Sequence, residues 1–87
     1  MKPEQIYQQL VDLAEKLDIS VSEKNLKGTG IKVKSGLCRV RKKTLFVMDK
    51  HQSVREKIRL LARCLGEMPL DDIYVIPAVR EEIQKHL

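Results

Sequence analysis

Two short β-rich runs followed by a capped helix constrain the fold of this 87-residue chain more than any other feature. Residues 37–41 (Leu-Cys-Arg-Val-Arg) and 44–48 (Thr-Leu-Phe-Val-Met) are separated by Lys42-Lys43, a spacing typical of antiparallel strands joined by a tight turn. Two lysines suit a turn with positive φ poorly, so a slightly longer loop over residues 41–44 stays open as an alternative. The sequence therefore predicts a β-hairpin at the centre of the chain.

The pairing of the two strands decides which side chains face the core. If Val40 pairs with Leu45 and Cys38 with Val47, these four side chains share one face, because successive residues of a strand point to opposite sides. We expect that face to be the core.

The other face of the predicted hairpin is mixed basic and apolar: it holds Leu37, Arg39, Arg41, Phe46 and Met48. Its apolar members, Leu37, Phe46 and Met48, form a candidate protein interface if they are exposed. The alternative is that the last helix of the chain covers them.

The helix after the hairpin has a clear start, since Ser53 and Glu56 have the spacing of a capping box. Its apolar residues recur at helical spacing and predict a core helix: Val54, Ile58, Leu61, Ala62 and Leu65. Arg55, Arg59 and Arg63 form a stripe of like charges on this helix, which is unfavourable unless an acidic group faces it.

The remaining segments complete the predicted domain. Residues 3–18 read as an amphipathic helix, residues 19–22 as a short edge strand, and Pro77 opens a last helix. Residues 31–34 are expected to add a strand or to extend the hairpin, after an ordinary loop at residues 23–30. We therefore predict a single α+β domain over residues 1–87, in the order helix, strand, strand, strand, helix, helix. Its small antiparallel sheet, the hairpin plus one or two short strands, is packed by three helices.

Positive charge is concentrated in the middle of the chain. Between Lys24 and Arg63 there are 13 Lys and Arg residues but only two acidic residues, whereas both ends are acidic. Either the ends neutralise the centre, or the centre attracts an acidic partner such as nucleic acid or an acidic protein. The basic residues that would contact phosphate groups are Arg39, Arg41, Lys42, Lys43, Lys50, Arg55, Lys57 and Arg59.

Cysteine and histidine usage argues against a metal or disulfide framework. Cys38 and Cys64 are expected to be reduced core thiols, and His51 and His86 have no metal-ligand spacing with them. No apolar run approaches the length of a membrane span. We expect a cytoplasmic protein without cofactor or metal and without membrane contact.

Residues 59–67 (Arg-Leu-Leu-Ala-Arg-Cys-Leu-Gly-Glu) resemble the active-site segment of ImmA/IrrE-type zincin metallopeptidases. Leu61, Ala62, Leu65 and Gly66 match the framework of that segment, and the preceding order of helix, sheet and capped helix is similar to the family's. In the resemblance the two zinc-binding histidines fall on Arg63 and Glu67, and the general-base glutamate falls on Cys64. A guanidinium cannot ligate zinc and a thiol cannot replace that carboxylate, so the resemblance implies a degenerate, zincin-like scaffold without peptidase activity.

These observations favour binding over catalysis. The first hypothesis is a non-catalytic protein-interaction or regulatory module of a small bacterial family, with an unknown protein or a second copy of the chain as partner. The second is nonspecific nucleic-acid binding through residues 39–59, which contain one aromatic residue, Phe46, and therefore little material for base stacking. An enzyme of unrecognised type is the third hypothesis.

Overall fold

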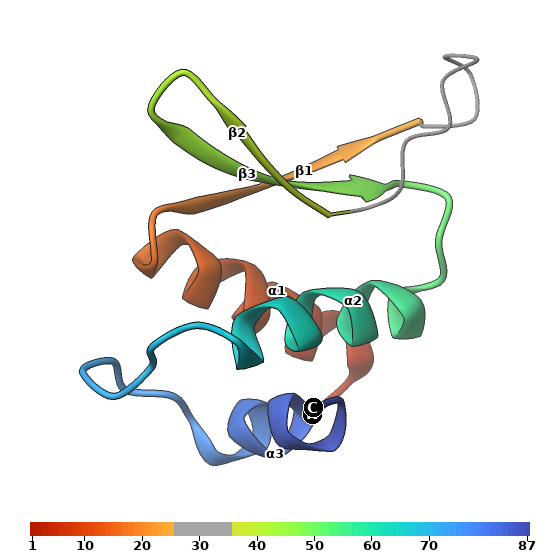
Figure 1. Ribbon diagram of the computed structural model, residues 1–87. Helices are drawn as coiled ribbons and strands as arrows, with labels where there is room; N and C mark the ends of the chain where they lie inside the picture. Colours follow the sequence, from red (N-terminus) through yellow and green to blue (C-terminus); the bar gives the residue numbers. More distant parts are fainter. Residues whose placement is uncertain (26–35) are drawn as a thin grey trace.

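Three helices lie on one side of a three-stranded sheet (Figure 1). The computed structural model describes residues 1–25 and 36–87. In chain order its elements are α1 (Pro3–Lys16), β1 (Ile19–Lys24), β2 (Gly36–Val40), β3 (Lys43–Asp49), α2 (Val54–Gly66) and α3 (Pro77–Lys85). The predicted α+β class and the predicted order of elements are confirmed. The predicted strand at residues 31–34 and residues 26–30 of the predicted loop lie outside the described residues. Residues 23 and 24, also predicted as loop, belong to β1, so the loop begins later than predicted.

The sheet is mixed, with β3 at its centre. The strand order is β1-β3-β2, in which β2 is antiparallel to β3 and β1 is parallel to it. Val21 of β1 and Leu37 of β2 lie on either side of Phe46 in β3. The hairpin is thus antiparallel as predicted, whereas the first strand joins it in the parallel sense. The most apolar strand takes the centre, where a neighbour on each side pairs its backbone.

One face of β3 is buried and contributes to the hydrophobic core between the sheet and the helices. Phe46 and Met48 are 3% and 0% exposed, and they pack with Ile19 of β1. The helices supply the rest of this core, which includes Leu10, Leu13, Ala14, Ile58, Leu61, Ala62 and Leu65. The helices α1 and α2 therefore form the layer directly under the sheet, and α3 packs beneath them (Figure 1).

The predicted core face of the hairpin was wrong. Cys38 pairs with Leu45, and Val40 pairs with Lys43, which is a register shift of two residues from the predicted pairing. A shift of two keeps the same side chains on one face, but that face points away from the helices: Cys38 is exposed, and Leu45 and Val47 are partly exposed. Since β3 is apolar on both faces, its alternation alone could not show which side the helices cover.

Helix boundaries follow the predicted signals closely. The Ser53 hydroxyl caps α2 by accepting a hydrogen bond from the backbone N–H of Glu56 at 3.2 Å, and Pro77 occupies the first turn of α3. The α1 helix ends two residues earlier than predicted, and Asp18 follows with a φ of 62°. Aspartate tolerates this left-handed conformation better than most residues, so the chain turns there into β1. No helix within the described residues is long and apolar enough to cross a membrane.

The two faces of β3 predict losses of stability of different size when their side chains are truncated. We expect Phe46→Ala to lower the free energy of unfolding by about 3–5 kcal/mol, because it removes a buried aromatic ring and leaves a cavity under the sheet. Leu45→Ala, on the partly exposed face, should cost about 1 kcal/mol. Urea denaturation followed by circular dichroism measures both values, and equal losses would contradict the assignment of the faces.

Candidate functional site

The predicted apolar interface is largely part of the core. Phe46 and Met48 are buried between the sheet and the helices, and of the three proposed residues Leu37 alone is exposed, at 49%. The prediction of an interface at Phe46 and Met48 was therefore wrong. The physical reason is that α1 and α2, rather than the last helix, pack under the sheet through contacts with β1 and β2, and their buried residues join Phe46 and Met48 in one core.

The eight basic residues proposed for nucleic acid fall into two groups. Arg39, Arg41, Lys42 and Lys43 lie where β2 turns into β3, and we call them the hairpin-end group. The others, Lys50, Arg55, Lys57 and Arg59, follow β3 or lie in the first half of α2. Residues 44–49 lie between Lys43 and Lys50, which puts these two cations about 23 Å apart along the strand at ~3.3 Å per residue. Arg55, Lys57 and Arg59 lie on α2, in the layer under the sheet. The eight cations are therefore divided between the sheet and the helix layer.

Two cations of the second group already have acidic partners. Lys57 forms an ion pair with Glu23 of β1, and its side chain is 14% exposed. Arg59 pairs with Glu56 within α2, where its Nε donates to Oε2 of Glu56 at 3.1 Å. The hydrogen bond from Arg59 lowers the pKa of the Glu56 carboxyl below its ordinary value. Neutralisation of the basic centre by an acidic end of the chain, as predicted, thus occurs at Lys57, whereas Arg59 is paired with an acidic residue of the centre itself.

Lys57, Glu23 and Tyr7 connect three elements at one end of the fold. The Lys57 ammonium lies 5.7 Å from the centre of the Tyr7 ring, within the range of a cation–π contact, and also pairs with Glu23. The Tyr7 hydroxyl is buried, and burial followed by the negative charge of Glu23 raises the pKa of Tyr7 to about 12. This cluster joins α1, β1 and α2, which makes it a structural contact.

The hairpin-end group is exposed and has no acidic partner. Arg39, Arg41, Lys42 and Lys43 are all exposed. Within residues 1–25 and 36–87, the ion pairs that form are Lys57–Glu23, Arg59–Glu56 and His86–Glu82, and none of them involves this group. Four cations adjacent along one hairpin therefore remain available to an external acidic group.

The turn of this hairpin consists of Arg41 and Lys42, one residue earlier than predicted. Arg41 has a φ of 55°, in the left-handed region that glycine and asparagine favour in such turns. A branched or long side chain in this conformation costs about 1–2 kcal/mol. The chain thus carries a cation at a position where turn stability alone would favour glycine.

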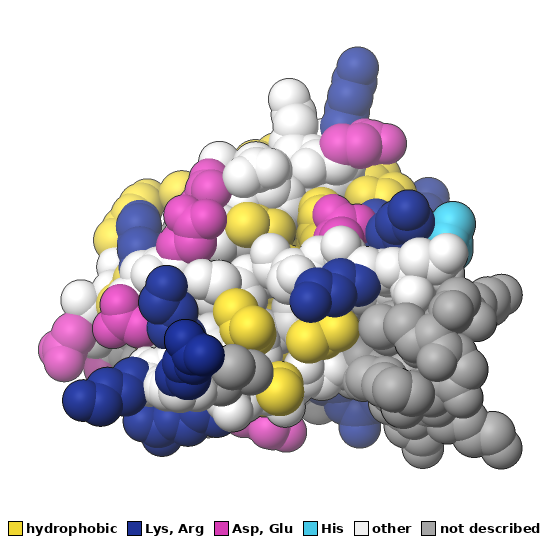
Figure 2. All heavy atoms as spheres, turned by 90° about the horizontal axis from the view of Figure 1, so that it is seen from above, with side chains coloured by type: hydrophobic (Ala, Val, Ile, Leu, Met, Phe, Trp, Pro, Cys, Tyr) yellow, Lys and Arg dark blue, Asp and Glu magenta, His cyan; other side chains and the backbone are white. Residues whose placement is uncertain are grey.

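Beside the hairpin-end group lies the uncovered face of the sheet. Its middle consists of two rows of paired residues: Ser20, Leu45 and Cys38 in one, and Ser22, Val47 and Gly36 in the other. We call these six residues the open sheet face. Figure 2, which looks down on it, shows hydrophobic side chains in separate islands and a dense group of Lys and Arg side chains at the end where the hairpin turns. Small residues on β1 and β2 thus flank Leu45 and Val47, and none of the six is charged.

Sequence reasoning missed this surface because it assigned Cys38, Leu45 and Val47 to the core. The usable signal was Ser20 and Ser22, whose small polar side chains mark one face of β1 as outward. That signal becomes informative when β1 is known to pair with β3 in parallel, which the sequence does not reveal.

The positions that match the zincin motif lie at the end of α2. Arg63 and Glu67 are exposed, and Cys64 is partly buried. Burial, followed by the charge of Glu67, raises the pKa of the Cys64 thiol. A raised pKa reduces the thiolate fraction at neutral pH, and the thiolate is the form that attacks substrates and binds metals. Both cysteines are free, and Cys38 is exposed rather than in the core as predicted.

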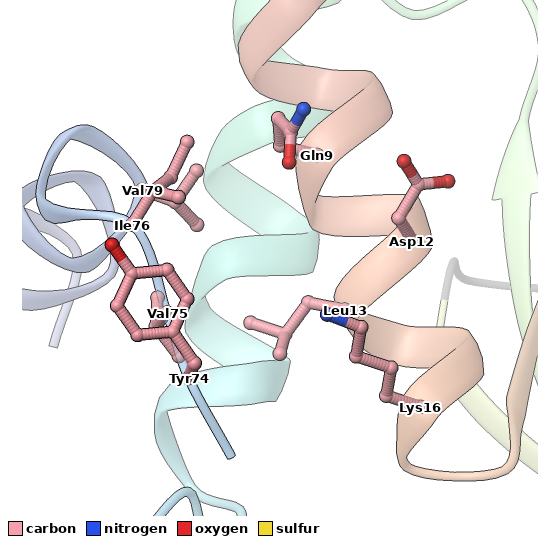
Figure 3. Close-up of a pocket in the computed structure, with 8 residues that line it drawn as sticks. All are labelled: Gln9, Asp12, Leu13, Lys16, Tyr74, Val75, Ile76 and Val79. Carbon is pink, nitrogen blue, oxygen red and sulfur yellow. The ribbon is translucent and has the colours of Figure 1, made fainter.

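Two hollows of the described surface are lined largely by apolar side chains. A pocket of about 60 Å³ between α1 and residues 74–79 has Leu13, Val75 and Tyr74 in its lining, and its Asp12 carboxylate points away from Tyr74 (Figure 3). A larger hollow of about 400 Å³ beside α3 combines apolar walls with Asp71 and Arg80. Within the described ranges, no three His, Cys, Asp or Glu side chains group so that they could hold a metal ion.

Comparison of the chain with protein-family models, curated proteins and solved structures finds no match. The resemblance to zincin metallopeptidases therefore stays a prediction from the sequence.

Tyrosine titration tests the cluster of Tyr7, Glu23 and Lys57. In a Tyr74→Phe variant, Tyr7 is the one remaining tyrosine, and we expect its ionisation, followed by near-ultraviolet absorbance, to have a midpoint near pH 12. Because the pKa in the folded chain lies above the ordinary value of 10, stability decreases as pH rises from 10 towards 12. Adding Glu23→Gln should lower the midpoint partway, since burial is the larger cause. A midpoint near 10 with intact circular dichroism would contradict the described packing.

Replacement of Arg41 tests the strain in the turn. We expect Arg41→Gly to raise the free energy of unfolding by about 1 kcal/mol, because glycine adopts positive φ without steric cost. Lys42→Gly is the matched control: it removes the same charge from a residue without positive φ and should give no gain. Equal effects in denaturant titrations would indicate charge repulsion rather than backbone strain as the cause.

Proposed function

We propose that the chain is a non-catalytic protein-interaction module that binds an acidic partner through the hairpin-end group and the adjoining open sheet face. The observation that carries this proposal is a set of exposed cations that form no ion pair within the described residues: Arg41, Lys42 and Lys43 border an uncharged, partly apolar surface, whereas Arg39 lies on the helix side of the sheet. The positive φ of Arg41 adds support, because strained residues are kept where function requires the side chain. In this proposal the degenerate zincin-like helix α2 serves as scaffold.

The surface chemistry favours protein over nucleic acid. Binding to a phosphate backbone gains with each cation that contacts it, whereas Lys57 and Arg59 are paired with carboxylates and Lys50 follows the far end of β3. The open sheet face also carries no aromatic side chain on which a base could stack. A protein segment can use both halves of the surface, since its acidic residues meet the cations and its apolar residues meet Leu45 and Val47.

The absence of catalysis and the compartment are parts of the same proposal. The positions that would carry zinc chemistry hold Arg63, Cys64 and Glu67, and the raised pKa of Cys64 disfavours a nucleophilic role. Two free thiols, one of them exposed, suit a reducing compartment, so we place the chain in the cytoplasm.

Charge reversal at the hairpin tests the proposed function. The probes are a fluorescein-labelled peptide of alternating Glu and Leu residues and a DNA duplex of equal charge, followed by fluorescence anisotropy. We expect Arg41→Glu, Lys42→Glu and Lys43→Glu together to weaken peptide binding by about a hundredfold, because close like charges at an interface cost several kcal/mol. The wild-type chain should bind the peptide more tightly than the duplex.

The matched control is a triple reversal of Lys2, Arg80 and Lys85, which changes net charge equally at exposed sites away from the hairpin. This control should leave peptide affinity within about threefold of the wild type, apart from long-range screening. Equal losses in both triple variants would reduce the effect to net charge and defeat the proposal. Tighter binding of the duplex, with an affinity that falls steeply between about 50 and 200 mM salt, would favour nucleic acid instead.

A further inference from the structure

One face of the sheet is covered by helices, and the other is covered by none of the described helices. All-parallel sheets occur almost only with both faces covered by helices, whereas antiparallel sheets commonly leave one face to solvent, and this mixed sheet contains one pair of each kind. Here β1 and β3 are parallel, and α1 and α2 pack under the sheet, whereas none of the described helices lies on the open sheet face (Figure 1). A helix added there would complete a three-layer arrangement.

The dimensions of the open sheet face fit one helix. Three strands spaced ~4.8 Å apart give a surface about 10 Å wide, which is close to the diameter of an α-helix. Along the strands, the seven residues of β3 span about 23 Å, or roughly 15 residues of helix at 1.5 Å per residue. Leu45 and Val47 form a central ridge, and the small Ser20, Ser22 and Gly36 beside it leave room for larger partner side chains.

Positive charge is unevenly distributed between the two ends of the open sheet face. At the hairpin end, Lys43 lies on the open side of the sheet and Arg41 and Lys42 form the turn. The acidic residue that strand pairing places nearest is Asp18, just before β1, and it forms no ion pair with them. At the opposite end Lys24 pairs across from Asp49, which is buried and accepts a hydrogen bond from the backbone N–H of His51. Unbalanced positive charge is therefore concentrated at the hairpin end.

We infer that the open sheet face binds an amphipathic helix of a partner protein, whose apolar stripe covers Leu45 and Val47 and whose acidic end lies over the hairpin-end group. This inference rests on the proposed function and adds the secondary structure and charge polarity of the partner. A second copy of this chain fits less well. Face-to-face stacking places the hairpin end either on its own copy, where cations meet cations, or on the end with Lys24 and Asp49, where the two charges already balance and offer the cations little attraction.

The test is a selection of binders from a display library of random peptides, about 16 residues long to match the face. Wild-type chain is the bait, and enriched peptides are synthesised for anisotropy measurements. We expect enriched sequences with apolar residues at i, i+3 and i+4 and with Asp or Glu gathered at one end.

The affinity of the enriched peptides should fall at least about tenfold when the chain carries Ser20→Glu plus Ser22→Glu. These serines lie on the uncovered face, outside the core, so the double variant is expected to fold. Gln84→Glu plus Gln52→Glu is the matched control, with two equal charges at exposed sites elsewhere.

The outcomes separate this inference from the proposed function. One outcome is enrichment of acidic peptides without helical spacing, whose binding is weakened by Arg41→Glu, Lys42→Glu and Lys43→Glu but not by the serine variants. That outcome would overturn the inference of a helical partner and leave the proposal of an acidic partner intact. If wild-type bait enriches no peptides beyond those enriched by the hairpin variant as bait, both the inference and the proposed function are overturned.

The exposed Cys38 provides an independent readout. Its alkylation should be fast in the free chain and at least about tenfold slower with a bound peptide, as expected for a site inside the interface. Slow alkylation in the folded free chain would show a face already covered, and would also overturn the inference.

Discussion

Burial of Phe46 and Met48 against α1 and α2 is the constraint on which the rest of the structure depends. These two side chains occupy alternate positions of the central strand, so their burial determines the face of the sheet that the helices cover. The pairing of β1 and β2 with β3 then fixes which of their residues point outward. Ser20, Ser22 and Cys38 reach the surface for this reason, and Leu45 and Val47 reach it despite being as apolar as many core residues.

Local features of the fold were predictable because their signals lie within a few residues. The cap at Ser53 and the proline at position 77 gave the starts of two helices, and the apolar spacing gave their buried faces. The hairpin was found from two β-rich runs, but its register and core face were not. Those depend on β1, which contacts β3 across more than 20 residues of sequence. No local pattern reveals that β1 runs parallel to β3.

At the candidate site too, ion pairs between residues close in sequence could be predicted, whereas pairs between distant residues could not. The pairing of Arg59 with Glu56 lies within one helical turn and is readable from an i, i+3 spacing. The pairing of Lys57 with Glu23 joins α2 to β1 and requires the fold. Composition identified the positive centre of the chain, but tertiary structure decided which cations are neutralised. The hairpin-end group was part of the predicted set, whereas the open sheet face beside it was not.

Two features of the hairpin end are locally destabilising, and a turn with a purely structural role would lack them. Arg41 occupies a left-handed conformation, and its neighbours Lys42 and Lys43 add like charge within three consecutive residues. Neither cost threatens the hairpin, because β3 is anchored by Phe46 and Met48 a few residues away, where burial of each side chain contributes about 2–3 kcal/mol. Strong anchoring of the central strand therefore permits an unfavourable turn at its end. A cationic turn held in this way presents its charges from a fixed backbone, so an acidic partner loses less conformational entropy on binding than it would with a flexible basic tail.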